Sequence, residues 1–160
     1  MAPNRVSYIF DLRGPSIAIN TACSSSLTCI AVARHAMQAG ECACALVGGA
    51  NLQLQPHWTS AFAAAGMLSP TNRCRFGDDA ADGYVRGEGV GVVIAELASQ
   101  ARVPALSRIA GVGIGQDGRS NGLTAPNPSA QGAVLTSAYS RANEPDALRK
   151  SVALVEAHGT

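Results

Sequence analysis

Two residues of this chain have the side chains and the local setting that nucleophilic catalysis needs. Cys23 lies in the string Asn-Thr-Ala-Cys-Ser-Ser-Ser-Leu of residues 20–27, between a strand-like and a helix-like run. The N–H groups of a first helical turn have no partners within the helix, so they favour a thiolate and can donate to a developing oxyanion. His158 follows an apolar run, where open α/β sheets carry reactive groups. The pattern alone leaves two interpretations open: a Cys nucleophile with a His partner, or an inert cysteine and a structural histidine.

Most of the other cysteines and histidines favour structural roles, and the role of Cys74, which stands in a polar loop, stays open. The five cysteines are odd in number and contain no Cys-x-x-Cys pair, so neither a disulfide framework nor a zinc site is indicated. Free cysteines in apolar runs behave as small hydrophobic residues, and we expect this of Cys29, Cys42 and Cys44. His35 and His57 have no evident partner. The acidic cluster in residues 78–82 does not match a calcium loop, so we expect a solvated or hydrogen-bonded loop.

The elements that must position Cys23 and His158 follow from hydrophobic periodicity. Residues 16–20 predict a short strand, and the following run, from an N-cap at Thr21 to a stop at Gly40, predicts a helix buried on more than one side. Further strands are expected at 43–47, 90–97, 109–114 and 152–155, with a helix over 129–143 and turns or short helices over 51–89. Strands alternating with helices predict an α/β fold with a sheet covered on both faces.

Composition excludes several classes of protein. Of the 160 residues, 47% are hydrophobic and 14% are charged, which excludes a disordered tail and predicts unusually large burial. A net charge of +1 without clustered basic residues gives no basis for binding nucleic acid or an anionic membrane. No apolar run approaches the roughly 18 residues that span a bilayer. Residues 1–10 lack a signal-peptide layout, so the expected compartment is the reducing cytoplasm.

Several strings taken together resemble the β-ketoacyl synthase family, most closely the ketosynthase domain of a modular type I polyketide synthase. They are Gly-Pro-Ser at 14–16, Thr-Ala-Cys-Ser-Ser-Ser at 21–26, Gly-Gly-Ala-Asn at 48–51, Met-Leu-Ser-Pro at 67–70, Ala-Asp-Gly-Tyr-Val-Arg-Gly-Glu-Gly at 81–89, the run 116–127, and Val-Glu-Ala-His-Gly-Thr at 155–160. They stand in the family's order over nearly the whole chain.

The resemblance implies a thiolase-like fold, in which two similar α/β halves form a five-layered αβαβα structure and pair as a homodimer. This chain would be an incomplete, internal portion with parts of both halves. Residues 1–99 would be the C-terminal part of the N-terminal half, 100–105 a connector, and 106–160 the first part of the C-terminal half. We expect such a piece alone to be insoluble or misfolded, and inactive.

The resemblance also assigns roles to residues. Cys23 would accept an acyl chain from an acyl carrier protein, and a malonyl-type extender would lose carbon dioxide and attack the Cys23 thioester. His158 matches the first of two catalytic histidines, which supports decarboxylation and polarises the extender thioester. Thr160 matches a string that contacts the phosphopantetheine arm, and Phe76 matches a loop aromatic that affects substrate fit. Neither a metal nor a bound cofactor would be required, because the pantetheine arm belongs to the carrier.

Departures from the family pattern leave alternatives open. Asn20 stands where relatives often carry Asp, and Phe76-Gly77 places the loop aromatic one position early. The family's second histidine and its lysine would lie downstream of Thr160. A fatty-acid or non-elongating, acyl-transferring ketosynthase is therefore an alternative. A non-catalytic, ketosynthase-like partner subunit is a further one, although Cys23 argues against it. The strings around Cys23 and His158 disfavour a degradative thiolase.

Overall fold

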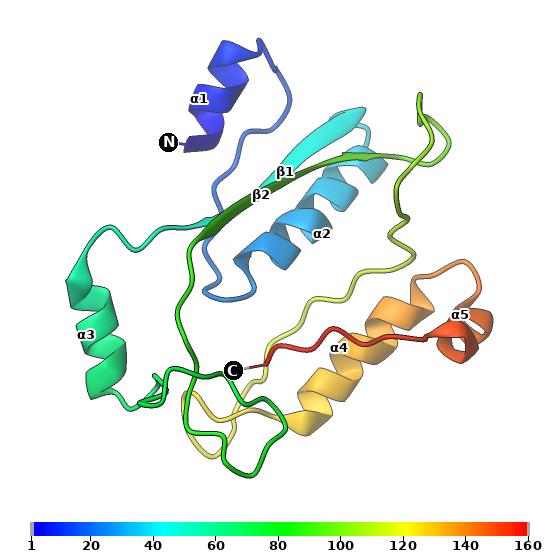
Figure 1. Cartoon of the computed structure of the whole chain (residues 1–160). Coiled ribbons are helices and arrows are strands. Elements are labelled where there is room, and N and C mark those ends of the chain that lie inside the picture. The colour runs from blue at the N-terminus through cyan, green and yellow to red at the C-terminus, as the bar shows by residue number, and fades with distance from the viewer. Residues whose placement is uncertain (1, 160) are drawn as a thin grey trace. The chain divides into compact units, whose positions relative to one another are not determined.

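The computed structural model describes residues 2–159 and shows a mixed α/β chain (Figure 1). The elements are α1 (Ala2–Ile9), α2 (Ser25–Gln38), β1 (Cys44–Asn51), α3 (Pro56–Ala64), β2 (Gly89–Glu96), α4 (Pro128–Ser140) and α5 (Pro145–Ser151). β1 and β2 pair side by side in a two-stranded sheet. The chain divides into two compact units. The first runs through Val47 and resumes over Val93–Ala153, and the second contains Gly48–Val92 and the segment from Leu154.

Helix α2 ends as its sequence predicts. Gly40 has a φ of 77°, a left-handed conformation that glycine adopts without the steric cost of a Cβ. The N–H of Gly40 donates to the carbonyl of Met37 (3.1 Å), and that of Glu41 donates to the carbonyl of Ala36 (2.9 Å). These two bonds form a Schellman motif and satisfy carbonyls that the helix end would leave unpaired. The predicted stop at Gly40 is therefore confirmed.

Only some of the predicted strands form. The runs 43–47 and 90–97 become β1 and β2, whereas 16–20, 109–114 and 152–155 contain no strand among the described residues. A strand needs a neighbouring strand for its N–H and C=O groups, and an apolar run without such a neighbour cannot form a ladder. The hydrophobic pattern predicts burial, and it does not supply the partner.

Alternate glycines allow the segment 111–115 to lie directly against α4. A Cβ on Gly111 would collide with the carbonyl of Ala138, and one on Gly113 with the carbonyl of Val134. A Cβ on Gly115 would collide with the side chain of Val134. Glycine at every second position is therefore a packing feature, because the three α-carbons on one side of an extended segment face the helix.

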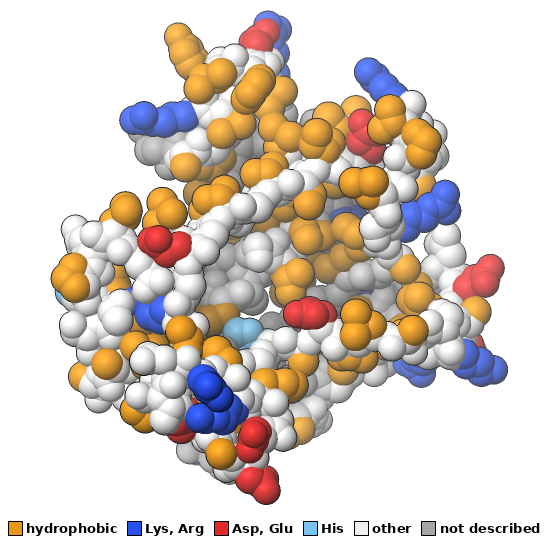
Figure 2. Space-filling model, viewed as in Figure 1, with side chains coloured by type: hydrophobic (Ala, Val, Ile, Leu, Met, Phe, Trp, Pro, Cys, Tyr) orange, Lys and Arg blue, Asp and Glu red, His pale blue; other side chains and the backbone are white. Residues whose placement is uncertain are grey.

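The large burial expected from composition is not found within this chain. Among residues 2–159, the buried hydrophobic side chains are Ala31, Met37 and Val47. Helix α2 is buried at Ala31 but leaves Leu27 68% exposed, so the expectation of burial on more than one side is wrong for this turn. Strand β2 exposes most of its apolar side chains, and hydrophobic groups lie open over the visible surface (Figure 2). No described helix is long and apolar enough to cross a membrane.

The sequence pattern gives no specific prediction for helices α1, α3 and α5. Helix α3 lies in the segment expected to contain short helices, and Pro56 occupies its first turn, where the missing N–H costs no hydrogen bond. Helix α5 also begins with a proline, Pro145, and packs against α4. The guanidinium of Arg149 lies 5.2 Å from the centroid of the Tyr139 ring, a cation–π contact between these two helices.

Candidate active site

Cys23 lies in an exposed turn that leads directly into α2. The hydroxyl of Ser25 donates to the carbonyl of Ala22 (2.6 Å), and the N–H of Ser25 donates to the same carbonyl (3.1 Å). The hydroxyl of Ser25 also accepts the N–H of Thr21 (2.9 Å). An isolated backbone bridge joins Thr21 and Cys23, and the hydrogen-bond distances among the described residues give the N–H of Cys23 no partner beyond it.

Neighbouring polar groups complete this turn. The hydroxyl of Ser24 donates to the carbonyl and to the hydroxyl of Thr21, both at 2.9 Å. The side-chain oxygen of Asn20 accepts the N–H of Ala22 (3.1 Å), and Ala22 itself has a φ of 54°. A left-handed conformation is uncommon for a residue with a Cβ and is held only where the surroundings impose it. The hydrogen bonds to the N–H and to the carbonyl of Ala22 impose this conformation, and they thereby fix the backbone position of Cys23.

Phe76 and the His158 segment lie together in the second compact unit. The chain passes under the Phe76 side chain at Gly159, where an added Cβ would lie 3.1 Å from both Cβ and Cγ of Phe76. Any residue other than glycine would have to displace the aromatic ring at this point. His158, immediately before Gly159, is exposed. The structure therefore places Phe76 against Gly159, the residue that follows His158. Cys23 belongs to the first unit, and Thr160 lies outside the described residues.

A hydrogen-bonded carboxylate organises the loop that carries Phe76. Asp82 accepts from the hydroxyl of Ser69 at Oδ1 (2.6 Å) and from the hydroxyl of Thr71 at Oδ2 (2.9 Å). Arg75 Nη1 lies 3.3 Å from Oδ2. The Ser69 bond, followed by the Thr71 bond and the charge of Arg75, lowers the pKa of Asp82 against the opposing effect of partial desolvation. The expectation of a hydrogen-bonded loop is confirmed for Asp82.

The run 116–127 forms a closed loop at the start of α4. The side-chain oxygen of Asn127 caps this helix by accepting the N–H groups of Ser129 (3.1 Å) and Ala130 (3.3 Å). The side-chain amide of Asn127 donates to the carbonyl of Asp117 (2.9 Å), and its N–H donates to the Asp117 carboxylate (3.2 Å). Asp117 and Asn127, which stand ten positions apart, thus close this loop. The sequence pattern does not predict this pairing, although both residues belong to the run 116–127 that resembles the family.

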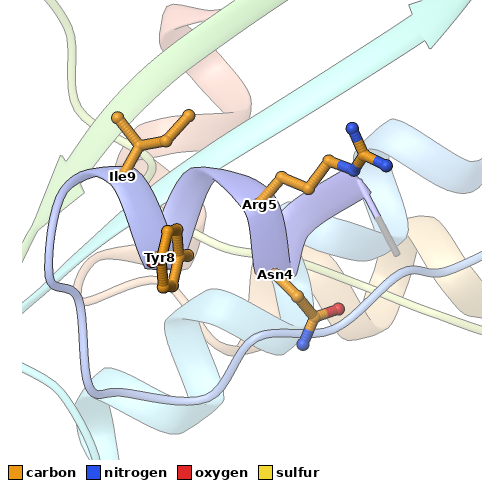
Figure 3. Close-up of a pocket in the computed structure, with 4 residues that line it drawn as sticks. All are labelled: Asn4, Arg5, Tyr8 and Ile9. Atoms are coloured by element: carbon orange, nitrogen blue, oxygen red, sulfur yellow. The ribbon is translucent and has the colours of Figure 1, made fainter.

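The remaining clusters and hollows do not resemble a reaction site. A hollow of about 340 Å³ on α1 is lined by Asn4, Arg5, Tyr8 and Ile9, all from that one helix (Figure 3). His35 is exposed on α2, and the His57 ring lies 5.0 Å from that of Trp58. No group of three or more potential metal ligands occurs within the described part of the chain. Burial, together with nearby Cys44 and Glu41, raises the pKa of the Cys42 thiol, which favours its uncharged form.

Two protein-family models match two successive segments of this chain. The family described as "Beta-ketoacyl synthase, N-terminal domain" matches residues 1–101, and "Beta-ketoacyl synthase, C-terminal domain" matches residues 106–160. The chain belongs to the β-ketoacyl synthase family. The resemblance inferred from the sequence strings is therefore confirmed.

Curated relatives of this β-ketoacyl synthase chain are large polyketide synthases. One component of the phenolphthiocerol/phthiocerol polyketide synthase of Mycobacterium tuberculosis is 49% identical over 98% of this chain, which spans 8% of that protein. Polyketide synthase ThaG of Burkholderia thailandensis is 46% identical over 100% of this chain and 3% of its own length. The chain thus corresponds to a small portion of each relative.

Solved ketosynthases show the same local structure. The oxazolomycin ketosynthase domain OzmH KS7 of Streptomyces albus JA3453 superposes with a TM-score of 0.86 at 39% identity, covering 89% of this chain and 26% of that domain's chain. The ketosynthase from module 6 of the bacillaene synthase of Bacillus subtilis 168 gives a TM-score of 0.84 at 41% identity, over 87% and 25%. The chain therefore spans about a quarter of each of these solved chains.

Proposed function

We propose that this chain is part of an elongating ketosynthase domain of a modular type I polyketide synthase, with Cys23 as the acyl-accepting nucleophile. The observation that carries the proposal is the exposed thiol at the start of α2, within a hydrogen-bonded turn, in a chain that matches both parts of the β-ketoacyl synthase family. The relatives support a polyketide rather than a fatty-acid pathway, because those named above are polyketide synthases.

The proposed organisation keeps the division drawn from sequence. Residues 1–99 belong to the N-terminal half, 100–105 form the connector, and 106–160 begin the C-terminal half. The family matches, which end at residue 101 and resume at residue 106, support a division in this region. The complete domain adopts the five-layered αβαβα thiolase fold and forms a homodimer. These additional layers and the second protomer cover the apolar side chains that are open here.

In the acylation step, the Cys23 thiolate attacks the thioester carbonyl of an acyl chain carried by an acyl carrier protein. The new sulfur–carbon bond forms, the bond to the carrier's sulfur breaks, and the carrier leaves as a thiol after taking up a proton. The N–H of Cys23 stabilises the oxyanion of the tetrahedral intermediate. The turn held by Ser24, Ser25 and Asn20 fixes this N–H and the sulfur relative to each other.

In the condensation step, a malonyl-type thioester on a second carrier loses carbon dioxide. The resulting carbanion attacks the Cys23 thioester, a carbon–carbon bond forms, and the Cys23 thiolate leaves. His158 donates to the carbonyl oxygen of the extender thioester, where negative charge develops. Phe76 forms part of the wall next to the His158 segment, supported by its contact with Gly159. Thr160 contacts the phosphopantetheine arm.

The proposed partners are acyl carrier proteins loaded with acyl and malonyl-type chains. Their phosphopantetheine arm supplies the only cofactor chemistry, so the ketosynthase itself holds no bound cofactor and no metal. We propose a cytoplasmic location, neither nucleic-acid-bound nor membrane-bound. The five free cysteines support a reducing compartment.

The proposal is tested by acylating the complete ketosynthase domain that contains this sequence. Incubation with an acyl thioester of N-acetylcysteamine adds one acyl group to the wild-type protein, detected by mass spectrometry and localised to Cys23 after proteolysis. Cys23→Ala abolishes this addition because no other side chain of the same turn carries a sulfur nucleophile. Cys44→Ala, which removes another exposed thiol on β1, is the matched control and leaves acylation unchanged.

Two results would contradict the assignment. Acylation that survives in Cys23→Ala rules out Cys23 as the nucleophile. Acylation of wild type without release of carbon dioxide from a malonyl-loaded carrier rules out elongation and identifies a non-elongating, acyl-transferring ketosynthase.

A further inference from the structure

The carboxylate of Asp82 joins three stretches of the second compact unit. Its Oδ1 accepts the hydroxyl of Ser69, which is 6% exposed, and its Oδ2 accepts the hydroxyl of Thr71. Arg75 Nη1 contacts Oδ2 at 3.3 Å and the Thr71 hydroxyl at 2.7 Å. A buried hydroxyl and an ion pair therefore share one carboxylate, and removal of that carboxylate would leave Ser69 and Arg75 without their common partner.

These contacts hold the loop 72–81 through Arg75, the residue that precedes Phe76. Arg75 immediately precedes Phe76, so the contact between Arg75 and Asp82 fixes the backbone next to the aromatic residue. One residue earlier, the sulfur of Cys74 accepts the N–H of Val85 at 3.1 Å. The N–H of Asp78 donates to the carbonyl of Arg75 at 3.1 Å and closes the turn around Phe76. The loop is thus attached to residues 82–85 at two successive positions.

The other end of this arrangement is the segment that carries His158. The Phe76 side chain lies over Gly159, where the backbone has no Cβ to hold it away. A shift of the Phe76 loop would consequently move the aromatic surface relative to the residue next to His158. The hydrogen bonds of the Asp82 carboxylate go to Ser69, Thr71 and Arg75, so its effect on the site passes through Arg75.

We propose that Asp82 is a positioning residue, which holds Phe76 against the His158 segment through its shared hydrogen bonds with Ser69, Thr71 and Arg75. The proposal rests on the proposed ketosynthase function and assigns to Asp82 control over how the acyl substrate is held. Removing the Asp82 carboxylate raises KM for the acyl thioester far more than it lowers kcat, because the nucleophile Cys23 is unchanged.

A double-mutant cycle on the complete ketosynthase domain tests this route. Asp82→Ala raises KM for the acyl thioester of N-acetylcysteamine by about tenfold in the presence of Phe76, a factor typical of coupled neighbouring residues. In a Phe76→Ala background the same substitution changes KM by less than about twofold, because the side chain that Asp82 positions is absent. Equal effects in both backgrounds would overturn the proposal, since a general loss of structure acts whether Phe76 is present or not.

A second variant removes the connection without removing the carboxylate. Arg75→Met keeps an unbranched chain of similar length but breaks the contact with Asp82 and Thr71, and it reproduces the higher KM. Asp79→Ala is the matched control, because Asp79 is an exposed carboxylate of the same loop, and it leaves KM unchanged. A normal KM in Arg75→Met would exclude the route through Arg75.

Amide hydrogen exchange separates failure of this proposal from failure of the proposed function. Asp82→Ala accelerates exchange in residues 72–81 and leaves exchange in α2 unchanged, with or without activity. A wild-type domain that takes up no acyl group would overturn the ketosynthase assignment and the substrate role with it, while faster exchange would still show that Asp82 holds the loop. Unchanged exchange in an active domain would overturn the positioning role alone.

Discussion

The turn around Cys23 and the loop around Phe76 are both held by hydroxyl groups, but the reach of their hydrogen bonds differs. In the Cys23 turn, every bond joins residues at most seven positions apart, and the longest joins the hydroxyls of Thr21 and Thr28. In the Phe76 loop, the bonds to Asp82 reach across 7, 11 and 13 positions. The first region is organised by its own sequence, and the second depends on a closure between separate strings.

Because of this difference, we expect one substitution to lower the free energy of unfolding more in the Phe76 loop than in the Cys23 turn. A local turn loses one hydrogen bond when one hydroxyl is removed, a change of about 1 kcal/mol in the free energy of unfolding. A loop closed at one carboxylate and one backbone crossing loses several contacts when either is disturbed. The position that tests this most severely is the crossing of residues 67–69 with residues 83–84.

The largest effect is expected from Gly83→Ala. Gly83 has a φ of 129°, and an added Cβ would lie 2.6 Å from the carbonyl carbon of Leu68 and 2.6 Å from the nitrogen of Ser69. The obstacles are backbone atoms, so the two strings must separate and the bonds between Tyr84 and Met67 and between Ser69 and Tyr84 are lost. We expect the complete domain to lose about 3 kcal/mol or more in its free energy of unfolding, measured by denaturant titration.

Gly87→Ala is the matched control for this substitution. Gly87 lies in the same string, and an added Cβ would meet no atom within 4 Å. We expect a change of at most about 1 kcal/mol there. Equal losses at the two positions would show that the string tolerates no side chain anywhere, and that the crossing at Gly83 is not the critical point.

The sequence predicts the Cys23 region far better than the Phe76 region for the same reason. The sequence predicts a first turn of serines and a stop at Gly40, and the helix does begin at Ser25 and end before Gly40. The predicted N-cap at Thr21 is wrong, because Ser24 occupies the N-cap position and the helix starts one turn later than expected. The hydrogen-bonded loop around Asp82 is also predicted correctly, but no spacing rule indicates that Ser69, 13 positions away, is the partner of Asp82. Contacts between distant strings require the fold itself.

The strands illustrate the same limit on the scale of the fold. The apolar runs 43–47 and 90–97 find each other and pair, whereas 109–114 has an equally apolar pattern and no strand partner among the described residues. Its alternate glycines lie against α4, and this contact explains a pattern for which the sequence alone offers no cause. Periodicity predicts which face is to be buried, and tertiary context determines what buries it.

An intermediate effect is expected on lowering the pH. The bonds from Ser69 and Thr71 and the charge of Arg75 lower the pKa of Asp82, so this carboxylate stabilises the folded loop at neutral pH. That contribution is complete above the ordinary Asp value of about 4 and is lost as the pH falls through the lower folded-state value. The Cys23 turn is held by neutral hydroxyl and amide groups and has no such dependence.

The acid effect is measured as amide protection factors of residues 72–81 relative to residues 20–28 between about pH 7 and about pH 3, a range that brackets the ordinary Asp value. The ratio falls with acidification in the wild-type domain and changes little in Asp82→Asn, which carries no titrating group at this position. A parallel fall in both proteins would show that other carboxylates are responsible. The conclusion that ionisation of Asp82 stabilises the Phe76 loop would then be wrong.

The smallest effect is expected within the Cys23 turn, from Ala22→Gly. Ala22 holds a φ of 54°, and glycine removes the steric cost of this conformation while increasing the freedom of the unfolded chain. We expect a net gain of about 0.5–1 kcal/mol in the free energy of unfolding, measured by denaturant titration, because the strain of a Cβ at positive φ exceeds the entropic penalty.

The reactivity of Cys23 in this variant tests whether the turn is as local as its hydrogen bonds indicate. The bonds from Asn20 and Ser25 to the backbone of residue 22 remain possible, since neither uses the Ala22 side chain. The rate at which iodoacetamide alkylates Cys23 therefore stays within about twofold of wild type if these local bonds alone set the turn. A destabilised variant, or a large change in the alkylation rate, would show that the Ala22 methyl group has a packing partner, and that the Cys23 turn is no more local than the Phe76 loop.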